Sequence, residues 1–410
     1  MIRSLRTGIT GLRSNQLRLD VIGNNIAGVN TSGFKRSRVL FQDALSQRIG
    51  TGGSLYGDAT RNPSNVGYGV TVGAIDRVWS QGAFEYTDLP TDLAIAGDGF
   101  FIAESQRGPV LTRLGAFSFD AEGHLVTSGG LRVQGWEATV NGEIVPGALT
   151  DIRLDPTAST PPVVTSSMTI EGNFAADREV GDAPIALSSV IYDGTGTPHT
   201  LVLTGEKTAT GEWTLTGAEL AGDPPTPLAI PTDGTEVITF GPDGIQTSAG
   251  LVAVTGAFPD GSPLAIDFDF SALTQYAGST TAAVTAQDGS AGGELVDYGF
   301  DQEGRLILAF SNGERRVAAQ VALGSVANPD GLEQVGDGFF SASVASGELQ
   351  VGRAGNEIPA GVVAGALEAS NVDLAEEFTD MIIAQRGYQA NARVVTTSDE
   401  LLQETVQLKR

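Results

Sequence analysis

The sequence predicts a mainly β protein with an α-helix at each terminus and several domains nested within one another. Apolar residues recur every three or four positions in the first and last segments, which is the spacing of one face of a helix. The chain between them carries most of the 54 glycines and 18 prolines, and its short apolar runs separated by turn residues are typical of β structure. The pentapeptide Gly-Asp-Gly-Phe-Phe occurs at residues 97–101 and again at 336–340, which indicates two halves of one β domain.

The first helix is expected at about residues 4–29. Its apolar stripe is interrupted by Gln16 and Gly23, and the segment after it is rich in glycine and asparagine, which tolerate the left-handed backbone angles that end helices. The stripe consists of Ile2, Leu5, Ile9, Leu12, Leu19 and Ile26.

The last helix is expected within residues 366–410, where the same spacing continues for about four and a half heptads. Gln385 and Asp399 are its polar interruptions. Two apolar stripes of this width cannot stay exposed to water, so we expect them to pair with each other, with other copies of the chain, or with both. The second stripe consists of Leu374, Phe378, Met381, Tyr388, Ala392, Val395, Leu402 and Val406.

The remaining chain divides by composition into a connector and two β domains. Residues 50–73 are rich in glycine, serine and asparagine, and they lack the GxxxxGK[ST] pattern of a phosphate-binding loop. A stretch rich in threonine and proline opens an insertion between the two halves of the first β domain. The predicted domains are a terminal helical coiled coil (1–30 and 366–410), a connector forming a long hairpin or an extended loop (31–73), a discontinuous β domain (74–150 and 288–365) and an inserted outer β domain (151–287).

The net charge of −25 is distributed unevenly. Residues 1–48 carry eight Lys and Arg against two acids, a balance of +6, whereas residues 364–410 have a balance of −4 and the body between them −27. Opposite signs favour association of the two ends, and an acidic body would repel nucleic acid and anionic membranes. The chain also lacks an apolar run long enough to span a bilayer or to serve as a secretory signal, so we expect no membrane insertion.

Residues for catalysis or metal binding are scarce. There is no cysteine, and His124 and His199 are the two histidines, so neither a thiolate metal site nor a histidine-based site is expected. Carboxylate pairs such as Asp88 with Asp92, or Asp267 with Asp269, could hydrolyse a sugar bond, but such pairs arise freely among 49 acids. We therefore expect no enzyme, no cofactor and no metal.

Two motif groups give the chain a family resemblance. The N-terminal group is LDVIGNNIA at residues 19–27 followed by NTSGFK at 30–35. The C-terminal group is GALEASNVDL at 365–374, MIIAQRGYQAN at 381–391 and TSDE at 397–400. With these motifs the chain resembles the flagellar rod and hook family of bacterial axial proteins, with Gly28 at a position where the family usually has asparagine.

The middle of the chain resembles the hook members of that family rather than the rod members. VIYDG at residues 190–194 with His199 and Thr200, and QVAL at 320–323 with ANPDGL at 327–332, are similar to hook-type segments, and rod members generally lack a large insertion. The resemblance implies that the terminal helices form a coiled-coil inner tube around an export channel and that the β domains form its outer layers. The subunit-assembly residues it implies are Asn24, Asn25, Phe34 and Gln385 together with Ile2, Leu5, Ile9, Leu12, Leu19, Ile26, Leu374, Phe378, Met381, Tyr388, Val395, Leu402 and Val406.

The resemblance also implies partners and a location. The principal partner would be further copies of the chain, polymerised into a curved, flexible tube that acts as a universal joint. The others would be distal rod and hook–filament junction proteins, and the hook cap and type III export apparatus during assembly. The protein would lie outside the cell, in the flagellum, after export without a cleaved signal peptide. The 50–73 connector would either influence the stiffness of the tube or act as a passive linker. Two alternatives remain open: a rod-like subunit of a straight tube, and an extracellular adhesin or carbohydrate-binding protein.

Overall fold

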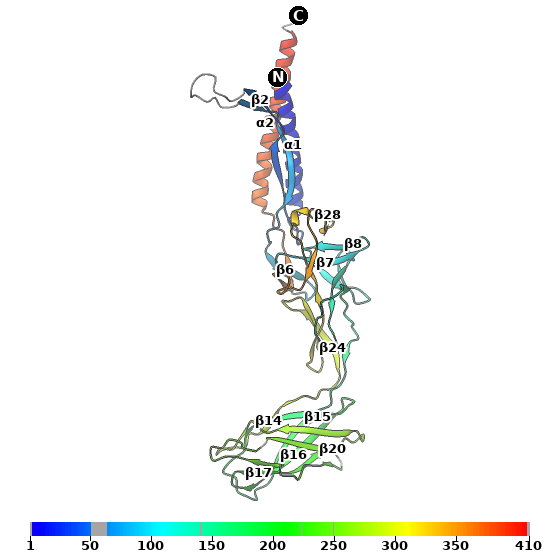
Figure 1. Ribbon diagram of the computed structural model, residues 1–410, viewed down its shortest axis with the longest axis vertical. Coiled ribbons are helices and arrows are strands. Elements are labelled where there is room, and N and C mark those ends of the chain that lie inside the picture. The colour runs from blue at the N-terminus through cyan, green and yellow to red at the C-terminus, as the bar shows by residue number, and fades with distance from the viewer. Residues whose placement is uncertain (1, 51–63, 140–141, 223, 249, 408–410) are drawn as a thin grey trace. The chain divides into compact units, whose positions relative to one another are not determined.

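The computed structural model describes residues 2–50, 64–139, 142–222, 224–248 and 250–407. The chain is mainly β with one long helix at each end, which confirms the predicted fold class (Figure 1). It divides into two compact units. Unit 1 comprises Met1–Asp155, Tyr298–Ile307 and Arg316–Arg410, and unit 2 comprises Pro156–Asp297 and Leu308–Arg315.

The two terminal helices are α1 (Ile2–Ala27) and α2 (Leu374–Gln407), and they lie side by side in opposite directions (Figure 1). Helix α1 ends where Gly28 N donates to the carbonyls of Asn24 and Asn25, two residues before the expected end. Helix α2 begins after Asp373, whose Oδ1 accepts hydrogen bonds from the backbone of Ala375 and Glu376 and so caps the helix.

The start of the C-terminal helical segment requires a correction. We expected the helical domain to begin at residue 366, but Ala366–Glu368 forms strand β32 and pairs with β5 (Phe84–Tyr86). Gly365 has a φ of +67°, and this left-handed turn separates β32 from the strand before it. A regular helix therefore cannot begin before the cap at Asp373.

The connector after α1 is a long, two-part hairpin. Strand β1 (Ser37–Asp43) pairs antiparallel with β4 (Val70–Arg77), with an irregularity between Leu40 and Phe41, and β2 (Ser46–Gly50) pairs with β3 (Ser64–Gly67). The hairpin runs beside α1, where a β-carbon on Gly69 would lie 2.2 Å from Thr10 Oγ1. The pairing extends to Arg77, beyond the expected boundary at residue 73. Of the connector at residues 50–73, for which an influence on tube stiffness was predicted, residues 51–63 lie outside the described residues.

The β domain of unit 1 contains both copies of the pentapeptide. Strand β8 lies between β7 and β29, so that Thr112 is opposite Phe101 on one side and Phe339 on the other. Besides β5 and β32, the strands of this domain are β6 (Leu93–Gly97), β7 (Phe100–Ser105), β8 (Gly108–Thr112), β9 (Phe117–Phe119), β10 (Leu125–Thr127), β11 (Arg132–Glu137), β12 (Thr150–Asp151), β26 (Arg315–Val321), β27 (Leu323–Ser325), β28 (Glu333–Gly336), β29 (Phe339–Ser341), β30 (Gln350–Gly352) and β31 (Ala360–Ala364), with a 3-10 turn at Pro329–Gly331.

Unit 2 is built from two five-stranded sheets around one apolar core. One sheet has the order β20-β21-β14-β22 with β23 beside β14, and the other has the order β15-β16-β17-β18 with β19 beside β17. Trp213 stacks on Phe174 at 4.6 Å within the core. The strands are β13 (Ser159–Thr160), β14 (Ser167–Asn173), β15 (Ile185–Tyr192), β16 (Pro198–Ala209), β17 (Glu212–Leu220), β18 (Thr226–Leu228), β19 (Val237–Thr239), β20 (Leu251–Ala257), β21 (Pro263–Asp269), β22 (Leu273–Thr274) and β23 (Ala283–Gln287).

The division between the units differs from the predicted boundaries at 151 and 287. Unit 2 begins at Pro156 and includes the returning chain as far as Asp297. Thr160 of β13 pairs with Gly293 of β24 (Gly293–Phe300), and Asp288 accepts hydrogen bonds from the backbone of Ser166 and Ser167. The outgoing and returning chains are therefore joined before they leave the unit. Strands β24 and β25 (Arg305–Phe310) continue from one unit into the other.

Candidate functional site

The contact between α1 and α2 is made mainly by small and polar residues. Ser4 Oγ lies 3.3 Å from Ser398 Oγ, and Asn25 Nδ2 donates to Glu377 Oε1 at 3.1 Å at the other end of the pair. A β-carbon on Gly8 would lie 3.0 Å from Val395 Cγ2. We call this contact the seam, and it consists of Ser4, Gly8, Gly11, Asn15, Ile22 and Asn25 of α1 with Glu377, Ala384, Gly387, Asn391, Val395 and Ser398 of α2.

Apart from Val395, the described residues of the predicted apolar stripes lie outside the seam. Pairing of the two stripes inside one chain, one of the arrangements expected from the sequence, is therefore not what joins α1 to α2. Four of the α1 stripe residues follow a seam residue by one position, as Leu5 follows Ser4, Ile9 follows Gly8, Leu12 follows Gly11 and Ile26 follows Asn25. Glycine and serine let the two backbones approach closely, which large side chains in the same positions would prevent. Because the seam occupies the face of contact between the two helices, most of the apolar stripe residues face the side of the helix pair.

Part of the α2 stripe and a second row of apolar residues remain exposed in the described part of the single chain. Phe378 is 50% exposed and Ile382 53% exposed on one side of the seam, and Leu401 is 52% exposed on the other. We call these two rows the apolar flanks. The first flank consists of Ile9, Leu374, Phe378 and Ile382, and the second of Ile383, Val394 and Leu401.

The other predicted assembly residues divide by burial. Asn25 is buried in the seam, whereas Asn24, Gln385, Tyr388 and Val406 are exposed. The side chain of Ile2 lies outside the described residues. Those that are half-buried are Leu5, Leu12, Leu19, Ile26, Phe34, Met381, Val395 and Leu402.

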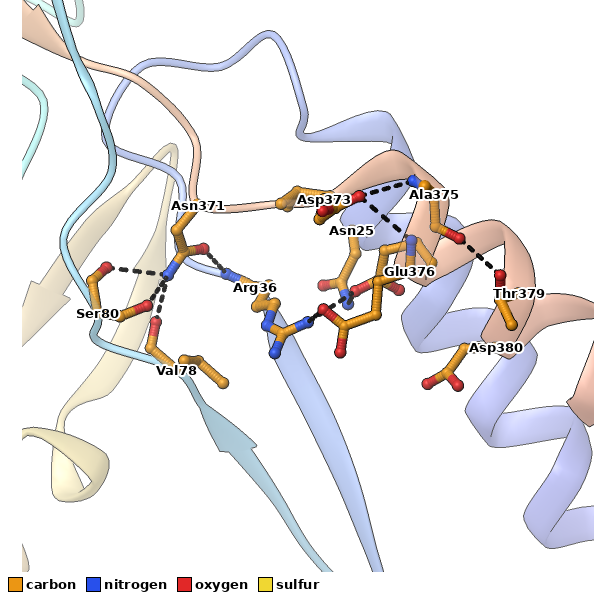
Figure 2. A network of polar contacts seen from close by, with 12 residues as sticks. Asn25, Arg36, Val78, Ser80, Asn371, Asp373, Ala375, Glu376, Thr379 and Asp380 are labelled. Atoms are coloured by element: carbon orange, nitrogen blue, oxygen red, sulfur yellow. Dashed lines mark hydrogen bonds and ion pairs between the residues drawn. The ribbon is translucent and has the colours of Figure 1, made fainter.

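The two motif groups meet at a junction between the helix pair and the β domain of unit 1. Gly33 N donates to Glu368 O at 2.6 Å, and Arg36 N donates to Asn371 Oδ1 at 2.8 Å. Asn371 Nδ2 in turn donates to the carbonyls of Val78 at 2.8 Å and Ser80 at 3.0 Å (Figure 2). One asparagine therefore joins the three chain segments that connect the helices to the β domain.

A buried cluster of charges lies in the same junction. Lys35 Nζ is 2.6 Å from Glu368 Oε1, and Arg113 Nη1 is 3.4 Å from Glu368 Oε2. Glu368 Oε1 also accepts a hydrogen bond from Gly82 N. Burial lowers the pKa of both Lys35 and Arg113, and the Glu368 carboxylate and the nearby Asp98 oppose this by favouring the charged cations. Asp98 belongs to the first copy of the pentapeptide, so that copy contributes to the charge balance.

Surface ion pairs join the basic N-terminal segment to the acidic start of α2, which confirms the attraction expected from the charge distribution. Arg18 Nη2 lies 3.0 Å from Asp380 Oδ2. Arg36 Nη1 lies 2.7 Å from Glu376 Oε2 (Figure 2). Burial raises the pKa of the neighbouring Glu377, while its contacts with Asn25 and Arg36 act in the opposite direction.

An aromatic cluster connects the two pentapeptides to the hairpin. The Trp79 ring centroid lies 5.2 Å from that of Phe100 and 5.3 Å from that of Phe340, in edge-to-face geometry. Arg77 lies over the Phe340 ring at 4.6 Å, and Trp79 Nε1 donates to Asp330 Oδ1. The hairpin, the junction and both halves of the β domain are thus packed together in unit 1.

Four family models match the chain, and together they extend over most of it. Their descriptions are "Flagella basal body rod protein" for residues 5–35, "Flagellar hook protein FlgE/F/G D1 domain" for 94–175, "Flagellar basal body protein FlaE D2 domain" for 181–290 and "Flagellar basal body rod FlgEFG protein C-terminal" for 363–408.

Relatives called flagellar hook protein FlgE are similar over the whole length. That of Borreliella burgdorferi is 37% identical over 458 residues and that of Treponema pallidum 34% over 466 residues, each covering 100% of both chains. That of Salmonella typhimurium is 32% identical over 426 residues, covering 99% of this chain and 100% of the relative. The chain belongs to the flagellar hook protein family. It is a structural subunit of the bacterial flagellar hook.

A solved structure of hook protein FlgE2 from Helicobacter pylori is also similar to this hook subunit. It has a TM-score of 0.48 and 13% identity, and the match covers 70% of this chain and 100% of that chain. Among the described residues of the hook subunit, neither helix is long and apolar enough to cross a membrane.

Sequence reasoning missed several residues of this site. Glu368 and Asn371 lie in a recognised motif, but nothing in their spacing indicates that one is buried with two cations and the other joins three segments. Ile383, Val394 and Leu401 lie outside the single apolar stripe that the sequence predicts for α2. A search of α2 for two apolar rows on either side of a small-residue row would have found them.

Proposed function

We propose that the hook subunit polymerises through the apolar flanks of its helix pair into a curved, flexible tube that transmits motor torque. The observation that carries this proposal is the contrast between the seam and the flanks. The seam uses small and polar residues for the contact within the chain, while Phe378, Ile382 and Leu401 remain about half exposed. Large apolar side chains arranged in rows on a surface are typical of a protein–protein interface.

The flanks can supply the energy of assembly. Burying one large apolar side chain contributes roughly 1.5 to 3 kcal/mol, and each helix pair offers several on each side of the seam. Two flanks on opposite sides of the seam suit a closed ring or helix of subunits, because each copy would contact one neighbour with each flank. The helix pairs would then line the tube, and the β units would form its outer part.

The junction suits the transmission of torque. The buried cluster of Lys35, Glu368 and Arg113 and the hydrogen bonds of Asn371 hold the helix pair against the β domain of unit 1. A force on the helices would therefore reach that domain without a flexible linker between them. The proposal includes no catalytic role.

The proposed partners follow from the same role. Besides further copies of the chain, we propose distal rod proteins and hook–filament junction proteins at the two ends of the tube. The hook cap and the type III export apparatus would act during assembly. The subunit would lie outside the cell after export without a cleaved signal peptide.

The test is a charge placed on the first flank. Phe378→Asp and Leu374→Asp are expected to abolish polymerisation, measured by sedimentation and electron microscopy of the purified protein, while circular dichroism shows a folded β body. Thr379→Asp is the matched control, because Thr379 is exposed in the same turn of α2 but outside both flanks. Normal tubes from either flank variant would contradict the proposal. A straight rather than curved wild-type tube would favour the rod-like alternative.

A further inference from the structure

The two helices carry the same short pattern at the middle of the seam. Gly11 is followed four residues later by Asn15, and Gly387 is followed four residues later by Asn391. In each helix the asparagine side chain donates to the carbonyl of its own glycine, at 2.8 Å from Asn15 Nδ2 and 2.9 Å from Asn391 Nδ2. These bonds hold both carboxamides in defined positions along the helix surface.

Each asparagine also lies against the glycine of the other helix. A β-carbon on Gly11 would lie 2.5 Å from Asn391 Oδ1, and a β-carbon on Gly387 would lie 2.8 Å from Asn15 Oδ1. Such distances are too short for a real β-carbon. The contact is therefore reciprocal, with one carboxamide of each helix filling the space that the other helix leaves at its glycine.

This arrangement depends on the axial register of the helices. A shift of one heptad moves α2 by about 10 Å along α1 and restores the orientation of the seam. It would bring Ala384 or Ser398 against Gly11, and Tyr388 or Leu402 against Gly8. The glycine would then face no carboxamide, and Gly8 would meet a large side chain where it now meets Val395.

We propose that the reciprocal contacts of Gly11 with Asn391 and of Asn15 with Gly387 form a register lock for the helix pair. Polar residues in a helix–helix contact contribute little to its stability but discriminate strongly against other registers, because a shifted asparagine loses its space and its packing. Gly11, Asn15, Gly387 and Asn391 act as positioning residues.

The register has a consequence for the surface of the helix pair. In antiparallel helices, the residues that follow the seam by one position turn toward the same side, so the α1 stripe and Phe378 share one side. The hairpin covers the other side of α1, where Gly69 lies against Thr10 and Arg3 lies over the Tyr68 ring at 5.4 Å. The lock thus determines which stripe residues of the two helices form a common face. This consequence for assembly rests on the proposed function, whereas the lock itself does not.

The absence of cysteine from the sequence allows a direct test by disulfide formation in the full chain. Ser4→Cys with Ser398→Cys reports the native register, since the two Oγ atoms are 3.3 Å apart. Ser4→Cys with Thr405→Cys reports a shift of one heptad, because position 405 follows 398 by seven residues. Oxidation of the unpolymerised protein is followed on non-reducing gels.

Asn15→Leu with Asn391→Leu replaces both carboxamides by apolar groups of similar shape. We expect the rate of native cross-linking to fall at least about tenfold, which corresponds to about 1.4 kcal/mol of register preference, while circular dichroism shows retained helix. Gln16→Leu with Gln389→Leu is the matched control, because both glutamines are exposed on the same helices and outside the seam. An unchanged native cross-link in the asparagine variant would overturn the lock.

Exchanging the glycine and the asparagine between the two helices distinguishes loss of the register lock from loss of folding. Gly11→Asn alone is expected to lose the native cross-link through overlap with Asn391, and adding Asn391→Gly is expected to restore it. Failure of the second substitution to restore cross-linking would count against the lock. Phe378→Asp should keep the native cross-link even where polymerisation is lost, so the outcomes for the lock and for the proposed function remain distinguishable.

Discussion

Lys35 Nζ lies 2.6 Å from Glu368 Oε1, and the two side chains, 333 residues apart in the chain, are almost completely removed from solvent. Lys35 ends the N-terminal motif group and Glu368 lies in the C-terminal group. Arg113 of the β domain contacts the other oxygen of the same carboxylate. A single glutamate thus joins both ends of the chain to the β domain of unit 1.

Glu368→Ala is expected to destabilise unit 1 by about 3 to 5 kcal/mol, because it leaves two cations buried without their shared partner. Urea unfolding of the unpolymerised full chain, monitored by Trp79 and Trp136 fluorescence against a Trp213→Phe background, measures this change. Glu357→Ala serves as the comparison, because it removes an exposed ion pair with Arg353 and should cost less than about 1 kcal/mol. Equal effects of the two substitutions would contradict the role assigned to the buried cluster.

Asn371→Ala is expected to destabilise unit 1 by about 1 to 3 kcal/mol, because the carbonyls of Val78 and Ser80 and the backbone N–H of Arg36 lose their hydrogen-bond partner. Asn371→Asp tests the geometry separately, since a carboxylate can still accept from Arg36 N but cannot donate to the two carbonyls. It should therefore also be destabilising. Hydrogen exchange at residues 34–37 and 78–80 should rise in both variants, and unchanged exchange would argue against the junction.

A separate prediction concerns the role of the second apolar flank in assembly. Ile383→Asp and Leu401→Asp should block polymerisation as strongly as Phe378→Asp, because each subunit is expected to use both flanks. Sedimentation of the purified protein measures the effect, and Thr379→Asp is again the control. Should only the first flank prove sensitive, the helix pair would contact neighbours on one side alone.

Unit 2 is expected to lose stability in acid through Asp193. Hydrogen bonds from His199, Thr195 and Thr197 lower the pKa of this carboxyl group below its usual range. Because the folded pKa is depressed, the stabilisation is fully present above the unfolded pKa of about 4 and is lost as the pH falls toward the folded pKa. Urea unfolding of the full chain, followed by Trp213 fluorescence between pH 7 and pH 3, should show a smaller decline in Asp193→Asn.

The matched control for this pH dependence is Glu212→Gln, which removes an exposed carboxylate at the start of a strand in the same unit. It should leave the pH dependence of unfolding close to that of the wild type. If Asp193→Asn and Glu212→Gln reduced the acid dependence equally, the effect would come from the net charge of the unit rather than from the contacts of Asp193.

Much of the architecture could be predicted because it depends on local patterns. Helical spacing located both helices, and the repeated pentapeptide indicated strands that the structure places on either side of β8. The boundaries between helices and strands were harder to predict from the sequence. Residues 366–368 have no feature that excludes helix, and only their pairing with β5, far away in the sequence, makes them a strand.

Only part of the candidate site could be predicted, because the rest depends on contacts between residues that are far apart in the sequence. The stripes are visible in the sequence because they are large and apolar, whereas the seam is made of glycine, serine and asparagine, which also occur in turns and on surfaces. Asn391 gains its role from Gly11, and Glu368 from Lys35 and Arg113, through contacts that spacing along the chain does not encode.

The sequence by itself determined the helical ends, the β body, the opposite charges of the termini and membership of the hook family, because each of these follows from residue types in local order. Only the tertiary structure decided which face of each helix is used within the chain and which remains exposed for neighbours. The physical reason is that the choice depends on how closely two backbones can approach, and Gly8, Gly11 and Gly387 permit this approach only when they are opposite particular side chains of the other helix.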